Sequence, residues 1–313
     1  MTGFQHLTVL CEETVDAILG DRNGCYVDAT FGRGGHSRQL LAALGPEARV
    51  IGFDKDPAAI AVGEALAKAD PRFSIIHDSF ASLARQLEAM QLAGEVTGIL
   101  ADLGVSSPQL DDAERGFSFM NDGPLDMRMD PTRGVSAADW LATVDEHMLA
   151  DAFFEFGEER HSRRIARALV AARAREPITR TRQLAELIAA AHPSWERHKH
   201  PATRCFQAIR IVVNRELDDL EDFLAQALRV LTPGGRFAVI SFHSLEDRLV
   251  KQFIQKESKG DDFPPGLPVT WQQLKPRLRK LGKAIEPSEA EVALNPRARS
   301  ARLRVAERLE VAA

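Results

Sequence analysis

Cysteine is scarce in this 313-residue chain, and long apolar runs are missing from it. Its three cysteines, Cys11, Cys25 and Cys205, stand far apart with no CxxC spacing, which argues against a disulfide framework and against a zinc site. They favour a reducing compartment, so we expect a cytoplasmic protein. Nowhere do about 18 apolar residues run together, and no basic stretch followed by an apolar one opens the sequence. We therefore expect no membrane partner and no export.

Charge of one sign does not dominate either. The net charge of −5 argues against a surface that binds nucleic acid throughout, although it is compatible with local basic patches. Because 44% of the residues are hydrophobic, the chain can bury a sizeable core, and its length suits two modest domains.

Apolar strands alternate with helical segments over the first third of the chain. Strands are predicted at residues 25–29, 49–54, 73–77 and 96–102, and the segments between them show helical spacing of apolar residues. This alternation is typical of a mostly parallel sheet with right-handed crossovers and helices on both faces. The sequence therefore predicts an α/β fold.

The alternation stops after the fourth strand. No strand is predicted from residue 106 to about 201, and helices are expected at 137–141, 145–156, 163–173 and 181–192. The remainder is expected to contain a helix at 204–231, a turn at 232–235, a strand at 236–242, a helix at 245–256, a long loop at 257–298 and an edge strand at 301–306. We accordingly divide the chain into a first core part (1–110), an inserted helical recognition domain (111–203) and a second core part (204–313).

A glycine-rich turn follows the first predicted strand. Gly32, Gly34 and Gly35 let the backbone come close to a ligand, because no Cβ intervenes. A dinucleotide-binding fingerprint, G-x-G-x-x-G, begins correctly here but fails at Ser37. The alternative to a ligand site is that Gly34 and Gly35 merely make a tight turn.

Acidic residues end three of the predicted strands. A site for S-adenosylmethionine needs an acid after the first strand, a glycine turn for the amino-acid part of the cofactor, and an acid after the second strand for the ribose hydroxyls. Asp28 and Asp54 supply the two acids. Such a ligand lies at the carboxyl ends of the strands, where this topology leaves a crevice.

Two further residues are candidates for the same site. Phe80, after the third strand, is expected either to stack on an adenine or to pack in the core of the next helix. Asp102, which ends the fourth strand, is expected to hold the methionine ammonium or to accept a hydrogen bond from a substrate amine, unless it is a solvated strand-end acid.

Longer motifs carry a resemblance to a known family. They are DATFGRGGHS at 28–37, DLGVSSPQLD at 102–111, RGFSF at 115–119, PLDMRM at 124–129, GEER at 157–160, AIR at 208–210 and SFHSLED at 241–247. With these motifs the chain resembles the RsmH (MraW) family of small-subunit ribosomal RNA methyltransferases, from about residue 6 to about residue 308.

The resemblance implies a fold, an activity and a set of site residues. It implies a Rossmann-like class I methyltransferase sheet with an inserted helical domain that recognises the substrate. It implies methyl transfer from S-adenosyl-L-methionine to N4 of a decoding-site cytidine in 16S rRNA, within the small ribosomal subunit. The implied cofactor contacts are Gly34, Gly35, His36, Asp54, Phe80, Asp102 and Gln109.

The residues also bear on the chemistry. Methyl transfer from a sulfonium is an in-line displacement, which requires positioning of the acceptor rather than a nucleophile. Cytosine C5 methylation would require a cysteine thiolate, and no cysteine follows the fourth strand, whereas Cys205 has an apolar flank. Methylation of an amino group is therefore favoured. Asp102, the expected catalytic residue, or the backbone carbonyls of residues 103–105 would accept the hydrogen bond from the amino group.

Substrate contacts are expected mainly in the helical insertion. Eight arginines between residues 160 and 182 are opposed only by Glu176, a pattern that favours phosphate contacts but is also compatible with a solvated helix face. Phe117 and Phe119 would either clamp a cytosine or pack at the base of the insertion. His243 would hold substrate or be a satisfied strand-end histidine. The candidate substrate residues are Phe117, Phe119, Arg128, Arg163, Arg164, Arg167 and His243.

Two further expectations concern metals and competing functions. His198 and His200 lack a third ligand nearby, so no metal is expected. The alternative to an enzyme is a non-catalytic ribosome-assembly factor that is stabilised by the cofactor, and a small-molecule methyltransferase is a third option that the arginines disfavour. The sequence is silent on the oligomeric state.

Overall fold

The computed structural model describes residues 8–193, 200–261 and 271–310. Two compact units make up the chain. The sheet unit consists of Met1–Gly104 and Leu217–Ala313, and the helical unit consists of Val105–Glu216.

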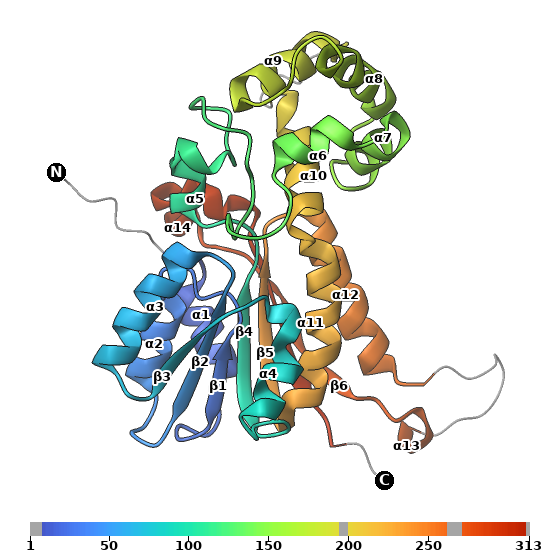
Figure 1. Ribbon diagram of the computed structural model, residues 1–313. Coiled ribbons are helices and arrows are strands. Elements are labelled where there is room, and N and C mark those ends of the chain that lie inside the picture. The colour runs from blue at the N-terminus through green and yellow to red at the C-terminus, as the bar shows by residue number, and fades with distance from the viewer. Residues whose placement is uncertain (1–7, 194–199, 262–270, 311–313) are drawn as a thin grey trace. The chain divides into compact units, whose positions relative to one another are not determined.

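The sheet unit contains one seven-stranded sheet (Figure 1) in the order β3-β2-β1-β4-β5-β7-β6. Its strands are β1 (Cys25–Asp28), β2 (Arg49–Asp54), β3 (Phe73–His77), β4 (Val96–Asp102), β5 (Leu231–Ser241), β6 (Leu278–Ile285) and β7 (Arg302–Arg308). Strands β1 to β5 pair in parallel, whereas β7 is antiparallel to both of its neighbours. This order is that of Rossmann-like class I methyltransferases, so the predicted fold class is confirmed.

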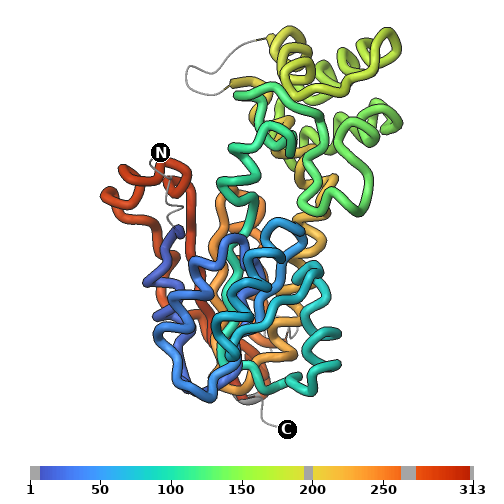
Figure 2. Tube along the Cα trace, turned by 60° about the vertical axis from the view of Figure 1, so that its left-hand side comes forward, coloured from blue at the N-terminus to red at the C-terminus, as the bar shows by residue number. Residues whose placement is uncertain are grey.

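Helices cover both faces of the sheet. Those on its faces are α1 (Cys11–Ile18), α2 (Gly35–Ala43), α3 (Pro57–Ala69), α4 (Leu83–Ala89), α11 (Glu216–Val230) and α12 (Ser244–Lys259). The unit also contains α13 (Trp271–Leu274), α14 (Glu289–Leu294) and the short 3-10 turns Phe80–Ser82 and Pro296–Ser300. The red segment that carries α14 lies beside the start of α1 (Figure 2), where the backbone N–H of Leu10 donates a 2.8 Å hydrogen bond to Glu291 Oε1. None of the helices in the described residues combines the length and the apolarity that crossing a membrane takes.

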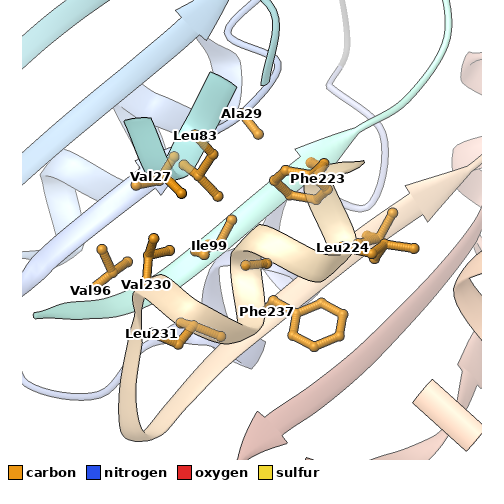
Figure 3. Close-up of a cluster of buried hydrophobic side chains, with 14 of the residues drawn as sticks. Val27, Ala29, Leu83, Val96, Ile99, Phe223, Leu224, Val230, Leu231 and Phe237 are labelled. Carbon is orange, nitrogen blue, oxygen red and sulfur yellow. The ribbon is translucent and has the colours of Figure 1, made fainter. Parts of the chain in front are cut away.

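Two apolar clusters, one on each face, hold the sheet unit together. Because successive strand residues point to opposite faces, Ile99 joins the cluster under α4, α11 and α12, whereas Leu100 joins the cluster under α1, α2 and α3. Phe223 and Phe237 are fully buried in the first cluster (Figure 3). Burial of such a side chain stabilises the fold by roughly 1.5–3 kcal/mol.

The helical unit has its own core. Its helices are α5 (Ser107–Asp111), α6 (Ala137–Thr143), α7 (Glu146–Glu155), α8 (Ser162–Arg173), α9 (Thr181–Ala191) and α10 (Ala202–Asn214), with a 3-10 turn at Ala113–Arg115. Apolar residues on one face of each long helix, such as Phe153, Ile165 and Leu184, are fully buried in a single cluster. Within its described residues the helical unit has no strand, only an isolated bridge between Pro124 and Arg180.

The single helix expected over 204–231 is wrong, because two helices occupy this range. Arg215 adopts the left-handed conformation (φ 55°) between α10 and α11. Both helices are amphipathic, so the apolar pattern continues through the break. The apolar face of α10 packs in the core of the helical unit, and that of α11 packs in the core of the sheet unit.

The long loop expected over 257–298 is also wrong. This range contains β6 and α14, and β6 is the edge strand, so β7 lies inside the sheet rather than at its edge. The basic composition of β6 resembles that of a loop, but lysine and arginine are also common on edge strands. The turn expected at 232–235 is included in β5, although the pairing with β4 shifts register between Leu231 and Arg236.

Candidate functional site

Strand register places the three strand-end acids at two levels of the sheet. Asp28 pairs with Gly52 on β2 and with Leu100 on β4. Asp54 and Asp102 therefore lie two residues farther along their strands, which is roughly 6–7 Å toward the carboxyl edge. Asp28 is fully buried as a result, while Asp54 and Asp102 reach the rim.

Asp28 braces the glycine turn from inside. Its Oδ2 accepts a 2.6 Å hydrogen bond from Ser37 Oγ, and its Oδ1 accepts one of 3.2 Å from the Thr30 backbone N–H. Burial raises the pKa of Asp28 to about 6, although these two hydrogen bonds act in the opposite direction. Ser37, which breaks the dinucleotide fingerprint, is thus the hydrogen-bond donor to Asp28, the acid that ends the first strand.

Close packing requires two of the three glycines of the turn, Gly34 and Gly35. Gly34 caps α2 in the left-handed conformation (φ 74°), and a Cβ there would lie 2.6 Å from the Phe31 ring. A Cβ on Gly35 would lie 1.8 Å from Thr8 Oγ1. At Gly32 the only heavy atom near a Cβ would be the Thr30 carbonyl oxygen, at 3.9 Å, so the backbone faces open space in the described structure.

Asp54 connects the second strand to this turn. Its Oδ2 accepts a 2.7 Å hydrogen bond from the Gly32 N–H, and its Oδ1 accepts one of 2.8 Å from the Asp56 N–H. Burial raises the pKa of Asp54, against the lowering effect of these two hydrogen bonds. Both carboxylate oxygens of Asp54 therefore accept hydrogen bonds from backbone N–H groups.

Asp102 differs from the other two acids, because its side chain has an open hydrogen-bonding position. Oδ1 is buried and has no hydrogen-bond partner among the described residues, and Oδ2 lies 3.9 Å from Nδ1 of the buried His36. The backbone N–H of Asp102 donates to Thr30 Oγ1 at 2.6 Å. Burial raises the pKa of Asp102 well above its usual range, and repulsion by Asp28 and Glu246 adds to this effect.

The remaining predicted cofactor residues of the sheet unit lie around these acids. His36 is in the first turn of α2, and its Nε2 is 3.2 Å from the Val9 carbonyl oxygen. Phe80 follows β3, half-buried, with its ring edge-on to Phe223 at 5.2 Å between centroids. This contact fits the core alternative, and the half-exposed ring still leaves a surface on which a base could stack.

The predicted aromatic residues of the helical unit have different environments. Phe117 is buried in the helical core, under the guanidinium of Arg115 at 5.8 Å from the ring centroid. Phe119 is half-buried, with its ring 4.7 Å from that of His200 and 4.8 Å from that of Phe206. Of the two, only Phe119 has an accessible ring.

Gln109 and Arg128 are engaged within the helical unit. Gln109 is buried, and its Oε1 accepts a 2.8 Å hydrogen bond from the Ser106 N–H in the capping box of α5. Arg128 donates two hydrogen bonds to the Asp126 carboxylate, at 2.9 and 2.6 Å. Burial acts to raise the pKa of Asp126, but the Arg128 hydrogen bonds and charge outweigh it and the pKa is lowered.

The arginine cluster is only partly available. Arg163, Arg164 and Arg167, hereafter the α8 arginines, are exposed on one helix, and Arg167 Nε lies 3.5 Å from Glu146 Oε1. Glu146 is therefore an opposing acid that lies outside the arginine-rich stretch of the sequence. Arg173 donates to the Leu141 carbonyl, and Arg180 forms an ion pair with Asp122 at 2.7 Å, so these two already have partners.

His243 is the N-cap of α12, where its Nδ1 accepts a 3.5 Å hydrogen bond from the Glu246 N–H. Its buried Nε2 lies 3.1 Å from Glu246 Oε1 but has no hydrogen-bond partner among the described residues, and Glu246 Oε2 accepts from the Phe242 N–H at 2.9 Å. Sequence reasoning missed Thr30 and Glu246 as neighbours of Asp102. Thr30 sits between the strand and the glycines, and the SFHSLED motif contains Glu246, so both lie inside motifs that were recognised.

His198 lies outside the described residues, and the absence of a metal stays a prediction.

A family model and a curated relative both match nearly the whole chain. A model of the MraW methylase family matches residues 3–309. A ribosomal RNA small subunit methyltransferase H from Chromohalobacter salexigens is 58% identical over 307 residues, which cover 98% of this chain and 92% of that protein.

Solved structures show weaker likenesses. An rRNA methylase from Streptococcus thermophilus is 12% identical with a TM-score of 0.42, and the match covers 95% of this chain and 93% of that one. A Streptococcus mutans protein in complex with SAH is 12% identical with a TM-score of 0.43, covering 97% and 99%. The assignment rests on the family model and the close relative, which both span nearly the full sequence: the chain belongs to the MraW methylase family.

Proposed function

We propose that this S-adenosylmethionine-dependent methyltransferase methylates N4 of a decoding-site cytidine in 16S rRNA, within the small ribosomal subunit of the cytoplasm. The observation that carries the proposal is the buried, unpartnered Oδ1 of Asp102, at the rim of the sheet beside the glycine turn. The name of the close relative supports the choice of RNA.

The residues at the rim fit the cofactor. S-adenosylmethionine supplies a methyl group on a sulfonium that is open to in-line displacement. Around Gly32 the backbone faces open space for its amino-acid part, and Asp54 would accept hydrogen bonds from the ribose hydroxyls. Phe80 would stack on the adenine. Gly34, Gly35, His36 and Gln109 complete the proposed set.

Asp102 is the proposed catalytic residue. A carboxylate oxygen without a partner accepts a hydrogen bond from the exocyclic amino group, which localises the nitrogen lone pair and raises its nucleophilicity. The raised pKa of Asp102 makes it a better acceptor for the proton that the amine loses. The other role open to Asp102, holding the methionine ammonium, would be evident as a loss of cofactor affinity rather than of turnover.

The cysteines support methylation of an amine over methylation of carbon. Methylation at cytosine C5 requires a thiolate that adds to the ring, and a thiolate requires a depressed pKa. Burial raises the pKa of Cys11 and of Cys25 to about 11, and it also raises the pKa of the fully buried Cys205 well above its usual range.

RNA contacts are proposed on the helical unit. The α8 arginines are exposed and suited to phosphates, and Phe119 rather than the buried Phe117 would stack on a base. Arg128 and His243 stay candidates for positioning the substrate, with their present partners Asp126 and Glu246 holding their orientation.

The experiment is a transfer assay on the natural particle. The protein and isotope-labelled S-adenosylmethionine are incubated with small subunits from a strain that lacks the gene, and the labelled nucleoside is identified by mass spectrometry. N4-methylcytidine at the decoding site is expected. Subunits that remain unlabelled while the protein binds both subunit and cofactor would instead support a non-catalytic assembly factor. Label in free metabolites alone would indicate a small-molecule methyltransferase.

A further inference from the structure

A pocket in the sheet unit lies apart from the rim that carries the three acids. It is formed by α12, β6 and β7, at the opposite edge of the sheet from β3, and encloses about 450 Å³. Figure 1 shows α12 and β6 as separate elements of the sheet unit. We name it the α12–β6 pocket. Its lining residues are Lys251, Ile254, Gln255, Ser258, Lys259, Lys280, Leu281, Gly282, Lys283, Ala284, Arg304 and Val305.

A bulge in the edge strand forms one wall of this pocket. Leu281 pairs with Val305 and Ile285 pairs with Leu303, so four steps on β6 correspond to two steps on β7. The extra residues include Gly282, which has a φ of 69° and faces open space, since a Cβ there would meet no heavy atom of the described residues within 4 Å. Bulges re-aim side chains at sheet edges and are frequent beside functional sites.

The lining is cationic over an apolar floor. Lys251, Lys259, Lys280 and Lys283 line the pocket, and no acidic residue of the described chain does. The apolar surface comes from Ile254, Leu281, Ala284 and Val305. The buried Oγ of Ser258 has no hydrogen-bond partner among the described residues.

Two acids near the pocket, Asp247 and Glu257, already have cationic partners. Asp247 accepts two hydrogen bonds from Arg304, at 2.6 and 3.0 Å, and Glu257 lies 2.6 Å from Arg277. Lys280 and Lys283 are exposed and form no ion pair within the part of the chain that the structure describes. The pocket therefore carries an excess of positive charge on a protein whose net charge is −5.

We propose that the α12–β6 pocket binds a phosphodiester segment of the substrate RNA away from the reacting base. The lysines contact phosphates, Ser258 Oγ donates to a phosphate or ribose oxygen, and the apolar floor accepts a ribose or base. Lysines on an edge strand also discourage strand pairing, but that role requires neither a cavity nor a cation on α12. The inference rests on the proposed function, since RNA is the polyanion that this function supplies.

The test is the double variant Lys280→Ala/Lys283→Ala in the full-length protein. Its matched control is Lys68→Ala/Lys256→Ala. This variant also removes two lysine charges, but from exposed positions of the sheet unit that do not line the pocket. For both we measure binding to small subunits by sedimentation, and kcat/KM for their methylation, between about 50 and about 200 mM NaCl.

The pocket variant is expected to bind subunits more weakly than the control. The slope of log affinity against log salt should be shallower by roughly 1.4–1.8, which corresponds to two lost phosphate contacts. Calorimetric S-adenosylmethionine affinity and the melting temperature should equal those of the control, and Lys280→Arg/Lys283→Arg should restore binding. A slope equal to that of the control would overturn the proposal.

Failure of this inference is distinguishable from failure of the proposed function. Wild-type protein that binds subunits without methylating them refutes the function, and the sedimentation comparison still decides on the pocket. A nucleoside monophosphate that binds the pocket as tightly as RNA would make it a small-molecule site, which would also overturn the proposal.

Discussion

Asp102→Asn is expected to make the protein more stable and less active at the same time. The substitution keeps the shape of the side chain and removes its charge. In the wild type, the buried carboxylate has an oxygen without a partner among the described residues, and the charges of Asp28 and Glu246 repel it. The ionised form therefore destabilises the fold in the absence of ligand, and asparagine removes this penalty.

Asparagine keeps a buried polar group at this position but removes its charge, and each unit by which the folded-state pKa exceeds the ordinary value corresponds to about 1.4 kcal/mol of destabilisation of the ionised form. For a chain of this size, 1 kcal/mol corresponds to about 2 °C, so the melting temperature should rise by about 2 °C or more at pH 8. Because the folded-state pKa of Asp102 is raised, wild-type stability falls as the pH rises from the ordinary carboxyl range through that pKa. This fall should shrink in the variant.

Activity should change in the opposite direction. Loss of a hydrogen bond to a charged acceptor costs about 1.5–3 kcal/mol, which lowers kcat by roughly 10- to 150-fold. If Asp102 acts on the substrate amine, the calorimetric dissociation constant for S-adenosylmethionine stays nearly unchanged. A comparable loss in that constant, with kcat retained, would assign Asp102 to the ammonium instead.

Asp54→Asn is the matched control, since it makes the same substitution at the same level of the sheet. Both oxygens of Asp54 accept backbone N–H groups, and asparagine offers only one acceptor oxygen, so this variant should melt below the wild type. Differential scanning calorimetry of the two variants from pH 5 to pH 8 tests the reasoning. An Asp102→Asn protein that melts no higher than the wild type at pH 8 and keeps its pH dependence would refute it.

Four further variants test the placement of individual residues. Replacement of all three α8 arginines by alanine should weaken RNA binding and flatten its salt dependence at unchanged cofactor affinity, and an unchanged salt slope would contradict the assignment. Gly34→Ala should lower the free energy of unfolding by about 1–2 kcal/mol for the left-handed conformation alone, and by more for the contact with Phe31, so the melting temperature should fall; an unchanged melting temperature would show that the turn can relax. Phe117→Ala should cost about 3–5 kcal/mol in denaturant titration and Phe119→Ala clearly less, so equal losses would refute their different burial.

Sequence patterns predicted the parallel strands of the sheet and most helix boundaries, because apolar periodicity records which face of an element is buried. The patterns could not predict the helix break at Arg215. There, two amphipathic helices that pack in the cores of different units follow each other without a glycine or proline between them. They also missed β6, whose lysines and arginines suit an edge strand as well as a loop. In both cases the deciding information is tertiary.

The sequence could predict which residues belong to the candidate site, but not which role each of them has there. Asp28, Asp54 and Asp102 are equivalent in the sequence, since each ends an apolar strand. Register separates them, because β1 ends two residues lower than its neighbours. Buried Gln109 and Phe117 show the same limit, since a motif does not tell whether a side chain holds a ligand or its own backbone.

The register also bears on the role that we propose for Asp102. Hydrogen bonds from Ser37 and Thr30 hold the pKa of Asp28 to about 6 despite complete burial, so Asp28 is largely ionised at neutral pH. Its negative charge, one level below the rim, raises the pKa of Asp102, which has no such donors on Oδ1 among the described residues. Two carboxyl groups are thereby driven to different pKa values by their surroundings, an arrangement that separates a structural acid from a reactive one. In the proposed function, the hydrogen bond that Oδ1 of Asp102 lacks among the described residues would come from the substrate amine, so substrate binding would relieve a cost that folding incurred.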